Sequence, residues 1–297
     1  QDSVRYQLIA MGTGNYAPQK PAQTWEMRYG DCKAKSMLLL AMLDRLGIAA
    51  EPVLANIDNG DLVPQMLPAP LAFDHVIVRA EVAGESFWLD GTASGTRFAD
   101  IRDVPRFGHV LPLRDKGAEL INLPVRANAR PALDLDLAYD GSAGVHLPMP
   151  FALRIRYSGP YAEQQRANAG VSSEDALLKI AETTAKKWTD SETIARPTAR
   201  YDPEDGTWTL DVEGVAFPDW EYGEGRLELA IEPTIRIDFK PDRSRSTWQQ
   251  LPALIAKPWT ARSRVAIRLP QEGSEATLEG GEPLKLALPA VEFERTA

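Results

Sequence analysis

The sequence predicts an α+β protein, and three observations support this prediction. An apolar helical segment near the start carries Cys32, the only cysteine among 297 residues. A β-hairpin pattern follows it, and the second half of the chain consists mostly of alternating strand-like segments separated by turn residues. Because chains of this length usually form about two domains, we expect a first domain over residues 1–125 and a mainly β domain with one helix over residues 126–297.

Two helices are expected in the first domain. The stretch "PAQTWEMRYG" predicts a short helix, because Pro21 is tolerated in a first helical turn and Gly30 is suited to ending the helix. A longer helix is expected over residues 32–46, and Gly47 is placed to end it in left-handed geometry. Residues 37–43 of this helix are all apolar, so we expect it to be buried on most sides.

Strands and turns are expected after these helices. The segment "AAEPVLANI" has the composition of a strand, and "FDHVIVRAEVAGESFWLDGT" has the alternation of a β-hairpin that turns at Ala83–Gly84. Residues 58–70 between them are rich in proline and predict an ordered loop without regular structure. The stretch "LPVRANARPAL" is the candidate linker to the second domain. In that domain, hairpin turns are expected at Asp140–Gly141 and Asp205–Gly206. The one helix of that domain is expected to begin at Ser172.

Composition excludes several classes of function. The formal net charge of −9 argues against a nucleic-acid-binding protein, because contacts with phosphates need a basic face. The longest unbroken apolar run, residues 37–43, is far shorter than the roughly 20 residues of a membrane-spanning helix. Three histidines and one cysteine lack the spacing of zinc ligands, so we expect no metal and no other cofactor. Since the chain begins "QDSVRY", without Met or a leader pattern, we expect it to be cut from a longer protein.

Cys32 occupies a position that favours reactivity. Asp31 is a good N-cap residue, which places Cys32 in the first turn of its helix. Backbone dipoles at a helix start favour a negative charge and therefore the thiolate form of a cysteine. Lys33 and Lys35 add positive charge nearby. A thiolate nucleophile also needs a histidine that holds it as an ion pair and protonates the leaving group.

His75 is the histidine that the sequence places best for this role, because it begins the strand "HVIVRA". Such a histidine needs an acceptor that orients its ring, and Asp90 in "FWLDGT" is the candidate. A two-residue turn at Ala83–Gly84 puts Asp90 opposite Ile77, which lies on the same strand face as His75. Asp90 is then the diagonal neighbour of His75, at roughly 7–8 Å between backbones and within side-chain reach.

Each of these residues also has a purely structural explanation. A cysteine in an apolar helix is often a core residue, a histidine at a strand start is often a satisfied core or surface residue, and an aspartate before glycine is often a turn acid. Their combination favours an active site, because a cysteine at a helix start is followed by a histidine and an aspartate on paired strands.

The stretch "YGDCKAKSMLLLAMLDRLGIAAEPVL", followed by "FDHVIV" and "FWLDGTASG", resembles the transglutaminase-like core of the papain-like superfamily. It is closest to the bacterial branch in which this core lies beside β-rich domains of unknown function. The resemblance covers residues 1–123 and implies a helix bearing the cysteine packed on an antiparallel sheet. It implies Cys32 as nucleophile, His75 as base and ion-pair partner, and Asp90 as orienting acid.

The oxyanion donors are less well specified by the sequence. The backbone N–H of Cys32 can serve, because it points out of the helix start. A second donor is either Tyr16, in a "GTGNYAP" stretch that also resembles the branch, or Trp25. Many relatives in the branch are exported, so the resemblance implies a periplasmic or cell-envelope location.

Two hypotheses of function remain open at this level. In the first, the protein is a thiol hydrolase or acyltransferase that acts on amide bonds of a protein or peptide substrate. Peptidase or amidase activity is favoured because water needs no dedicated acceptor site, and transglutaminase-type transfer to an amine is the variant. In the second, the core is catalytically inactive and the protein is a binding or scaffold module whose β-region mediates protein or glycan interaction.

Overall fold

The computed structural model describes most of the chain, namely residues 2–8, 17–170, 174–191, 193–195, 197–223, 226–229, 242–250, 260–270, 282–288 and 291–296. Helices and mostly antiparallel sheets make it an α+β protein, as the sequence predicts. Its contacts divide it into two compact units. The first unit consists of Gln1–Ala132, Tyr157–Asn168 and Tyr201–Trp208, and the second of Leu133–Arg156, Ala169–Arg200 and Thr209–Ala297.

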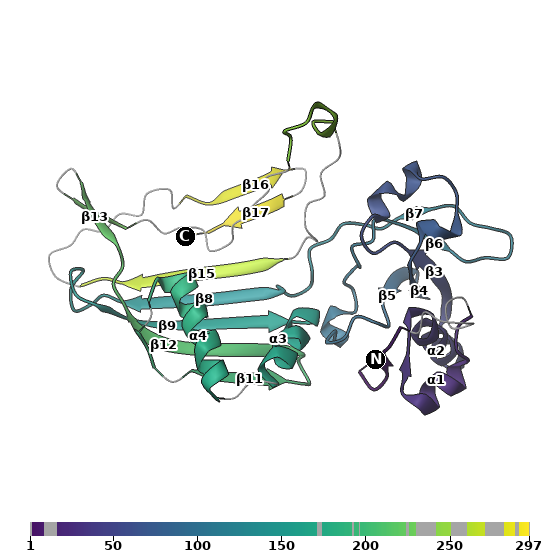
Figure 1. Ribbon diagram of the computed structural model, residues 1–297, viewed down its shortest axis with the longest axis horizontal. Coiled ribbons are helices and arrows are strands. Elements are labelled where there is room, and N and C mark those ends of the chain that lie inside the picture. The colour runs from purple at the N-terminus through teal and green to yellow at the C-terminus, as the bar shows by residue number, and fades with distance from the viewer. Residues whose placement is uncertain are drawn as a thin grey trace. The chain divides into compact units, whose positions relative to one another are not determined.

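In the first unit, two helices near the start of the chain lie beside a five-stranded antiparallel sheet of order β5-β4-β3-β6-β7 (Figure 1). The helices are α1 (Pro21–Met27) and α2 (Cys32–Arg45). The sheet strands are β3 (Ala49–Ala55), β4 (His75–Val82), β5 (Glu85–Leu89), β6 (His109–Pro112) and β7 (Ile121–Asn122). Two short strands, β1 (Arg5–Tyr6) and β2 (Tyr29–Gly30), pair in parallel outside this sheet.

Helix α2 begins and ends where the sequence predicts. The Asp31 side chain accepts a hydrogen bond from the Ala34 N–H at 2.9 Å and so caps the helix start. Gly47 follows the last turn at φ 71°, a left-handed conformation that glycine adopts without steric cost. The expectation of burial on most sides is wrong, because Met37 and Met42 are exposed. Helix α2 contacts β3 and β4 of the sheet and also α1, while Met37 and Met42 face solvent.

Apolar side chains on both faces of the sheet form the core of the first unit. On the helix side, Leu43 of α2 packs with Val78 and Ala80 of β4. On the other side lies a second cluster of buried residues: Val53, Ala55, Ile77, Trp88, Val110 and Leu123. Each buried valine, leucine or isoleucine among them stabilises the fold by roughly 1.5–3 kcal/mol relative to an exposed one. Strands β3 and β4 are therefore held firmly, and β4 begins with His75.

The hairpin of β4 and β5 has the predicted register. Ala83 at φ 53° and Gly84 at φ 80° form a two-residue turn in which both residues are left-handed, the geometry that suits the twist of paired strands. Val78 pairs with Leu89, as a turn at these two residues requires. Asp90 follows the last residue of β5 and so extends the hairpin by one position.

Two local predictions in the first unit are wrong in detail. Helix α1 ends at Met27, and the left-handed residue that follows it is Arg28 at φ 58°, two positions before the Gly30 that we expected to end the helix. Gly30 instead lies in β2, where a Cβ atom would come within 2.6 Å of the Ala34 Cβ. The stretch of residues 58–70 is more regular than predicted, because it contains the 3-10 turn Gly60–Gln65 and the start of another, Pro70–Ala72.

The later part of the chain builds a six-stranded sheet of order β10-β12-β9-β8-β15, in which β11 also pairs with β12. Its strands are β8 (Leu133–Asp140), β9 (Met149–Ser158), β10 (Thr193–Ile194), β11 (Thr198–Asp202), β12 (Thr207–Ala216) and β15 (Ala261–Arg268). Two hairpins complete the described strands: β13 (Trp220–Gly223) with β14 (Arg226–Leu229), and β16 (Leu284–Leu288) with β17 (Val291–Arg295).

The prediction of one helix in this region is wrong, because two are present: α3 (Pro160–Gly170) and α4 (Glu174–Thr189). The sequence of α3, "PYAEQQRANAG", has no apolar stripe, so no helical periodicity marks it. Helix α4 crosses the sheet in Figure 1, and its Ala181 and Ala185 are fully buried. Its expected cap, Ser172, lies outside the described residues.

The turn expected at Asp140–Gly141 is a longer loop, because β9 begins only at Met149.

A search of the described ranges for a helix long and apolar enough to cross a membrane finds none.

The N-cap of α2 gives a first test of the fold around Cys32. Replacing Asp31 with Ala should lower the free energy of unfolding of the first unit by about 1 kcal/mol, because the Ala34 N–H loses its acceptor. Urea unfolding, followed by the exposure of the single cysteine to a thiol reagent, measures this. Asp31→Asn is the matched control and should retain most of the stability, since asparagine also caps. Equal losses in both variants would assign the effect to the Asp31–Lys33 ion pair instead.

Candidate active site

The site is built where the start of α2 meets the start of β4. Cys32 is the first residue of α2, and His75 is the first residue of β4. The two elements are tied together beside the site, because the Ser36 hydroxyl donates a hydrogen bond to the Val76 carbonyl at 3.0 Å. Ser36 lies one turn after Cys32, and Val76 follows His75. This bond therefore fixes the helix start relative to the strand that carries the histidine.

His75 and Asp90 are joined by a hydrogen bond of 3.0 Å between Nε2 and Oδ2. The register of the hairpin brings them together, since Asp90 follows directly after Leu89, the partner of Val78. Cys32 lies close enough to His75 to be among the groups that raise the pKa of the imidazole. The structure thus brings together the three residues that the sequence singles out, in the order Asp90, His75, Cys32.

The three side chains are largely shielded from solvent. Cys32 and His75 are each 5% exposed, and the Asp90 side chain is 12% exposed. The Phe107 ring packs edge-on against the His75 ring at 5.4 Å between centroids, which fills the space beside the imidazole. Electrostatic interactions within the site are therefore stronger than they are in water.

The environment favours the charged form of His75. Burial lowers the pKa of His75, but hydrogen bonds with Asp90 and Cys32 and the negative charges of both raise it, to about 9. Burial likewise raises the pKa of Asp90, yet the hydrogen bond and charge of His75, with hydrogen bonds from Thr92, hold it below its ordinary value. At neutral pH the pair is an imidazolium beside a carboxylate. A cationic histidine next to a thiol favours the thiolate.

Thr92 holds Asp90 in position, a role that we did not predict. Its N–H and its hydroxyl donate to the Asp90 Oδ1 at 2.8 Å and 2.7 Å, which leaves the Oδ2 oxygen for His75. The spacing Asp-x-Thr in "DGT" was the available signal, because an aspartate commonly accepts from the residue two positions on. For Phe107, 32 positions after His75, no local signal exists.

The residue before His75 is also fixed. Asp74 donates its N–H to the Ala55 carbonyl at 3.1 Å and accepts from the Ile57 N–H through its side chain at 2.9 Å. The Asn56 side chain donates to the Ala72 carbonyl at 2.9 Å. The Pro-rich stretch therefore returns to β4 through a backbone that is hydrogen-bonded on both sides, which leaves His75 little freedom.

The two lysines after Cys32 have different surroundings. The Lys33 ammonium pairs with Asp31. Lys35 is buried, and its Nζ donates to the Val4 carbonyl at 2.6 Å. Burial lowers the pKa of Lys35, while the negative charges of Asp2 and Asp90 raise it. The expected positive charge near Cys32 is therefore present, but it is tied to specific partners.

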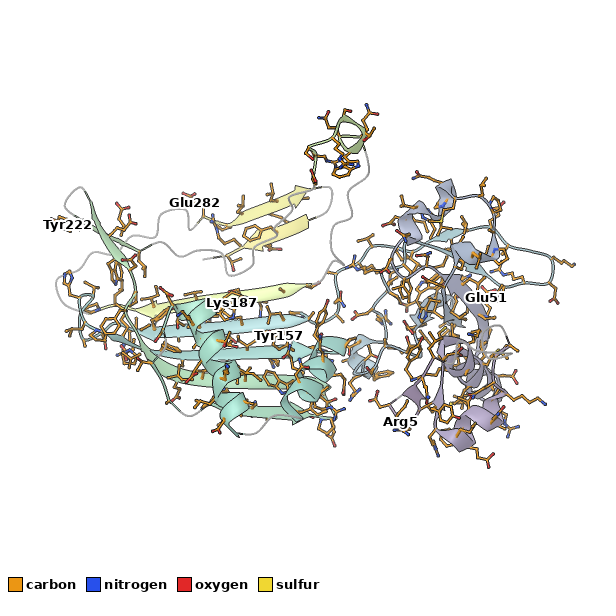
Figure 2. All side chains as sticks on the ribbon, viewed as in Figure 1. Arg5, Glu51, Tyr157, Lys187, Tyr222 and Glu282 are labelled. Atoms are coloured by element: carbon orange, nitrogen blue, oxygen red, sulfur yellow. The ribbon has the colours of Figure 1, made fainter. Side chains whose placement is uncertain are left out.

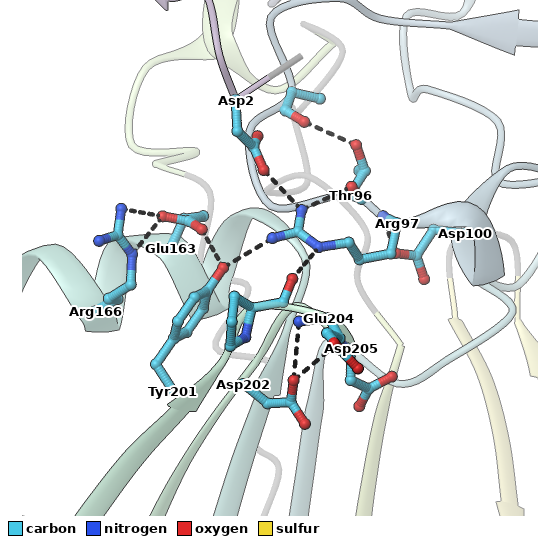
Figure 3. Close-up of polar contacts among 12 residues, drawn as sticks. Asp2, Thr96, Arg97, Asp100, Glu163, Arg166, Tyr201, Asp202, Glu204 and Asp205 are labelled. Atoms are coloured by element: carbon cyan, nitrogen blue, oxygen red, sulfur yellow. Dashed lines mark hydrogen bonds and ion pairs between the residues drawn. The ribbon is translucent and has the colours of Figure 1, made fainter.

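The chain that follows β5 is held at Arg97, at the centre of a polar cluster in the first unit (Figure 3). The Arg97 guanidinium pairs with Asp2 at 3.0 Å and donates to the Tyr201 hydroxyl at 3.0 Å and the Pro203 carbonyl at 2.8 Å. Tyr201 in turn donates to Glu163. This cluster fixes both the segment after the candidate aspartate and the start of the described chain.

The two proposed oxyanion donors have different positions. Tyr16 lies outside the described residues. Trp25 lies in α1 and is 46% exposed, and the Arg28 guanidinium carbon lies 3.7 Å from its ring centroid. The N–H of Cys32 belongs to the first turn of α2, whose N–H groups have no acceptor within the helix. It is therefore free of helical pairing, as an oxyanion donor needs to be.

Among the residues that the structure describes, no group of three or more His, Cys, Asp or Glu side chains could hold a metal ion. The groups that the candidate site itself brings together are a thiol, an imidazole and a carboxylate. Comparisons of the chain with protein-family models, with curated proteins and with solved structures find no match.

The pKa of His75 makes stability depend on pH in a defined direction. Because it is raised from 6.5 to about 9, the stabilisation that it contributes is complete below pH 6.5 and is lost as the pH rises through 9. The free energy of unfolding of the wild type relative to His75→Asn should therefore fall by up to about 3 kcal/mol over that range. Urea unfolding at a series of pH values measures this.

The exposed His146 provides the matched control for that series. His146→Asn should keep the loss of stability between pH 6.5 and pH 9, because it retains His75. A wild type and a His75→Asn variant with parallel pH profiles would contradict the proposed pairing. On the acid side the sign reverses. The stabilisation that comes from the lowered pKa of Asp90 is present above the ordinary aspartate value and is lost as the pH falls through the folded value.

Proposed function

We propose that the protein is a thiol hydrolase or acyltransferase that acts on amide bonds through Cys32, His75 and Asp90. The observation that carries the proposal is the hydrogen bond between His75 and Asp90 beside the single cysteine, which raises the pKa of His75 to about 9 together with the charge of Cys32. A charged imidazole next to a thiol at a helix start is the arrangement that activates cysteine nucleophiles. The resemblance to the transglutaminase-like core of the papain-like superfamily supports the same assignment of roles.

In the proposed reaction, the Cys32 thiolate attacks the carbonyl carbon of an amide and a sulfur–carbon bond forms. The carbonyl electrons move to the oxygen, and the oxyanion accepts a hydrogen bond from the Cys32 N–H. As the oxyanion collapses, the carbon–nitrogen bond breaks and His75 gives its proton to the leaving amine. Asp90 keeps the imidazole ring oriented through both steps.

The acyl-enzyme then passes its acyl group to a second nucleophile. Water gives a carboxylic acid and makes the protein a peptidase or amidase, and its proton returns to His75. An amine gives a new amide and makes it an acyltransferase of the transglutaminase type. We favour hydrolysis, because water needs no binding site for an acceptor, and we propose a protein or peptide as substrate.

The pH dependence of Cys32 alkylation tests this function. Iodoacetamide should label Cys32 rapidly at pH 6 in the wild type, with mass spectrometry as the readout, because the imidazolium of His75 favours the thiolate. In His75→Ala, labelling at pH 6 should be slower by on the order of 100-fold, since an unassisted thiol ionises near pH 8.5. The chain has one cysteine, so the label reports a single site.

The exposed His146 again provides the control, and His146→Ala should label like the wild type. Labelling that rises only near pH 8.5 in the wild type, or an absence of labelling in the folded protein, would rule out the enzyme. It would favour the binding or scaffold module instead. Circular dichroism of each variant verifies that a change in rate is not a loss of folding.

A further inference from the structure

The start of the chain pairs with the segment that leads into Cys32. Strand β1 runs parallel to β2, with Arg5 paired to Tyr29 and Tyr6 paired to Gly30. The Gln7 N–H donates to the Gly30 carbonyl at 3.0 Å. Strand β2 leads directly to the N-cap of α2, so Tyr6 lies beside the residue that is two positions before Cys32.

A second anchor holds this strand against α2. The buried Lys35 donates its Nζ hydrogen to the carbonyl of Val4, and Val4 is 5% exposed. Lys35 is three residues after Cys32 and therefore lies on the same side of the helix. The backbone is thus held on both sides of Tyr6. Val4 accepts a hydrogen bond from Lys35 of α2, and Gln7 donates one to Gly30 of β2.

The Tyr6 side chain combines exposure with closeness to the nucleophile. Tyr6 is 51% exposed, whereas Cys32 is 5% exposed. Partial burial raises the pKa of the phenol, as do the negative charges of Cys32, Asp31 and Asp90, so the hydroxyl stays protonated and remains a donor at neutral pH. Tyr6 is therefore a solvent-exposed donor beside the segment that leads into the buried Cys32.

We propose that the Tyr6 hydroxyl contacts the substrate and donates a hydrogen bond to the oxyanion that forms when Cys32 attacks a carbonyl carbon. It is the second donor beside the Cys32 N–H. When the sulfur–carbon bond forms, the negative charge of the thiolate moves to the carbonyl oxygen. A donor next to the thiolate can stabilise that charge after it has moved. This role rests on the proposed function and adds a residue that the sequence did not single out.

Two reagents that modify Cys32 by different routes separate this role from the activation of the thiol. p-Nitrophenyl acetate acylates the thiolate through a tetrahedral oxyanion, which collapses to a thioester as the carbon–oxygen bond breaks and p-nitrophenolate leaves. Iodoacetamide alkylates the thiolate by displacing iodide, and no oxyanion forms. A donor to the oxyanion therefore affects only the first reaction, whereas a change in the thiolate affects both.

The experiment compares wild type and Tyr6→Phe at pH 6 to 8, with mass spectrometry of the modified chain as the readout. We expect acylation by p-nitrophenyl acetate to slow by about 100-fold in Tyr6→Phe, the typical effect of losing one oxyanion donor. Alkylation by iodoacetamide should keep the rate and pH profile of the wild type. Tyr222→Phe, at an exposed tyrosine of the second unit, is the matched control and should leave both rates unchanged.

The outcomes distinguish this inference from the proposed function. Equal acylation rates in wild type and Tyr6→Phe, with rapid alkylation at pH 6, would overturn the role of Tyr6 and leave the Cys32–His75 pair intact. Slowing of both reactions by Tyr6→Phe would also overturn it, since the hydroxyl would then act on the thiolate. A wild type that reacts with neither reagent at pH 6 would contradict both proposals.

Discussion

The arrangement of the candidate site depends on the hydrogen bond between His75 and Asp90. A charged imidazole that is 5% exposed has lost most of its hydration, and removing an ion from water costs several kcal/mol unless a partner compensates. Asp90 supplies that compensation at 3.0 Å, and the hydrogen bonds from Thr92 keep it ionised and oriented. The pKa of His75, about 9, indicates that pairing outweighs burial here.

This bond can form because two rigid elements meet at one point. The hairpin places Asp90 one residue beyond β5, and the bond from Ser36 to Val76 holds the start of α2 against β4. Apolar packing on both faces of the sheet keeps β4 in place. The side chains of the first unit are drawn in Figure 2, where Arg5 of β1 and Glu51 of β3 are labelled. A site built on strands and a helix start keeps its geometry better than one built on loops.

The start of the chain is part of the same arrangement. Lys35 connects it to α2, and the charge of Lys35 also interacts with Asp90. Arg97 connects the start of the chain, through Asp2, to the segment that follows β5. The charged side chains of Lys35 and Arg97 therefore restrain the start of the chain and the segment that follows the proposed acid, Asp90. In our proposal this restraint positions Tyr6 for contact with the substrate.

Local pattern alone predicted several features of this region correctly. The cap at Asp31, the end of α2 before Gly47 and the register that follows from Ala83–Gly84 each depend on residues a few positions apart. Backbone geometry links such residues directly, so the hairpin pattern already implied that His75 and Asp90 lie close together.

Other features were decided only by the tertiary structure. Phe107 beside His75, Lys35 bonded to Val4, and Tyr6 opposite Gly30 join residues that are far apart in the chain. Helix α3 has no apolar periodicity that would mark it. The sequence by itself therefore determined which residues are candidates for the proposed chemistry and how the hairpin aligns His75 with Asp90. The surroundings of those residues were decided by long-range packing, because no local periodicity specifies which distant segments pack together.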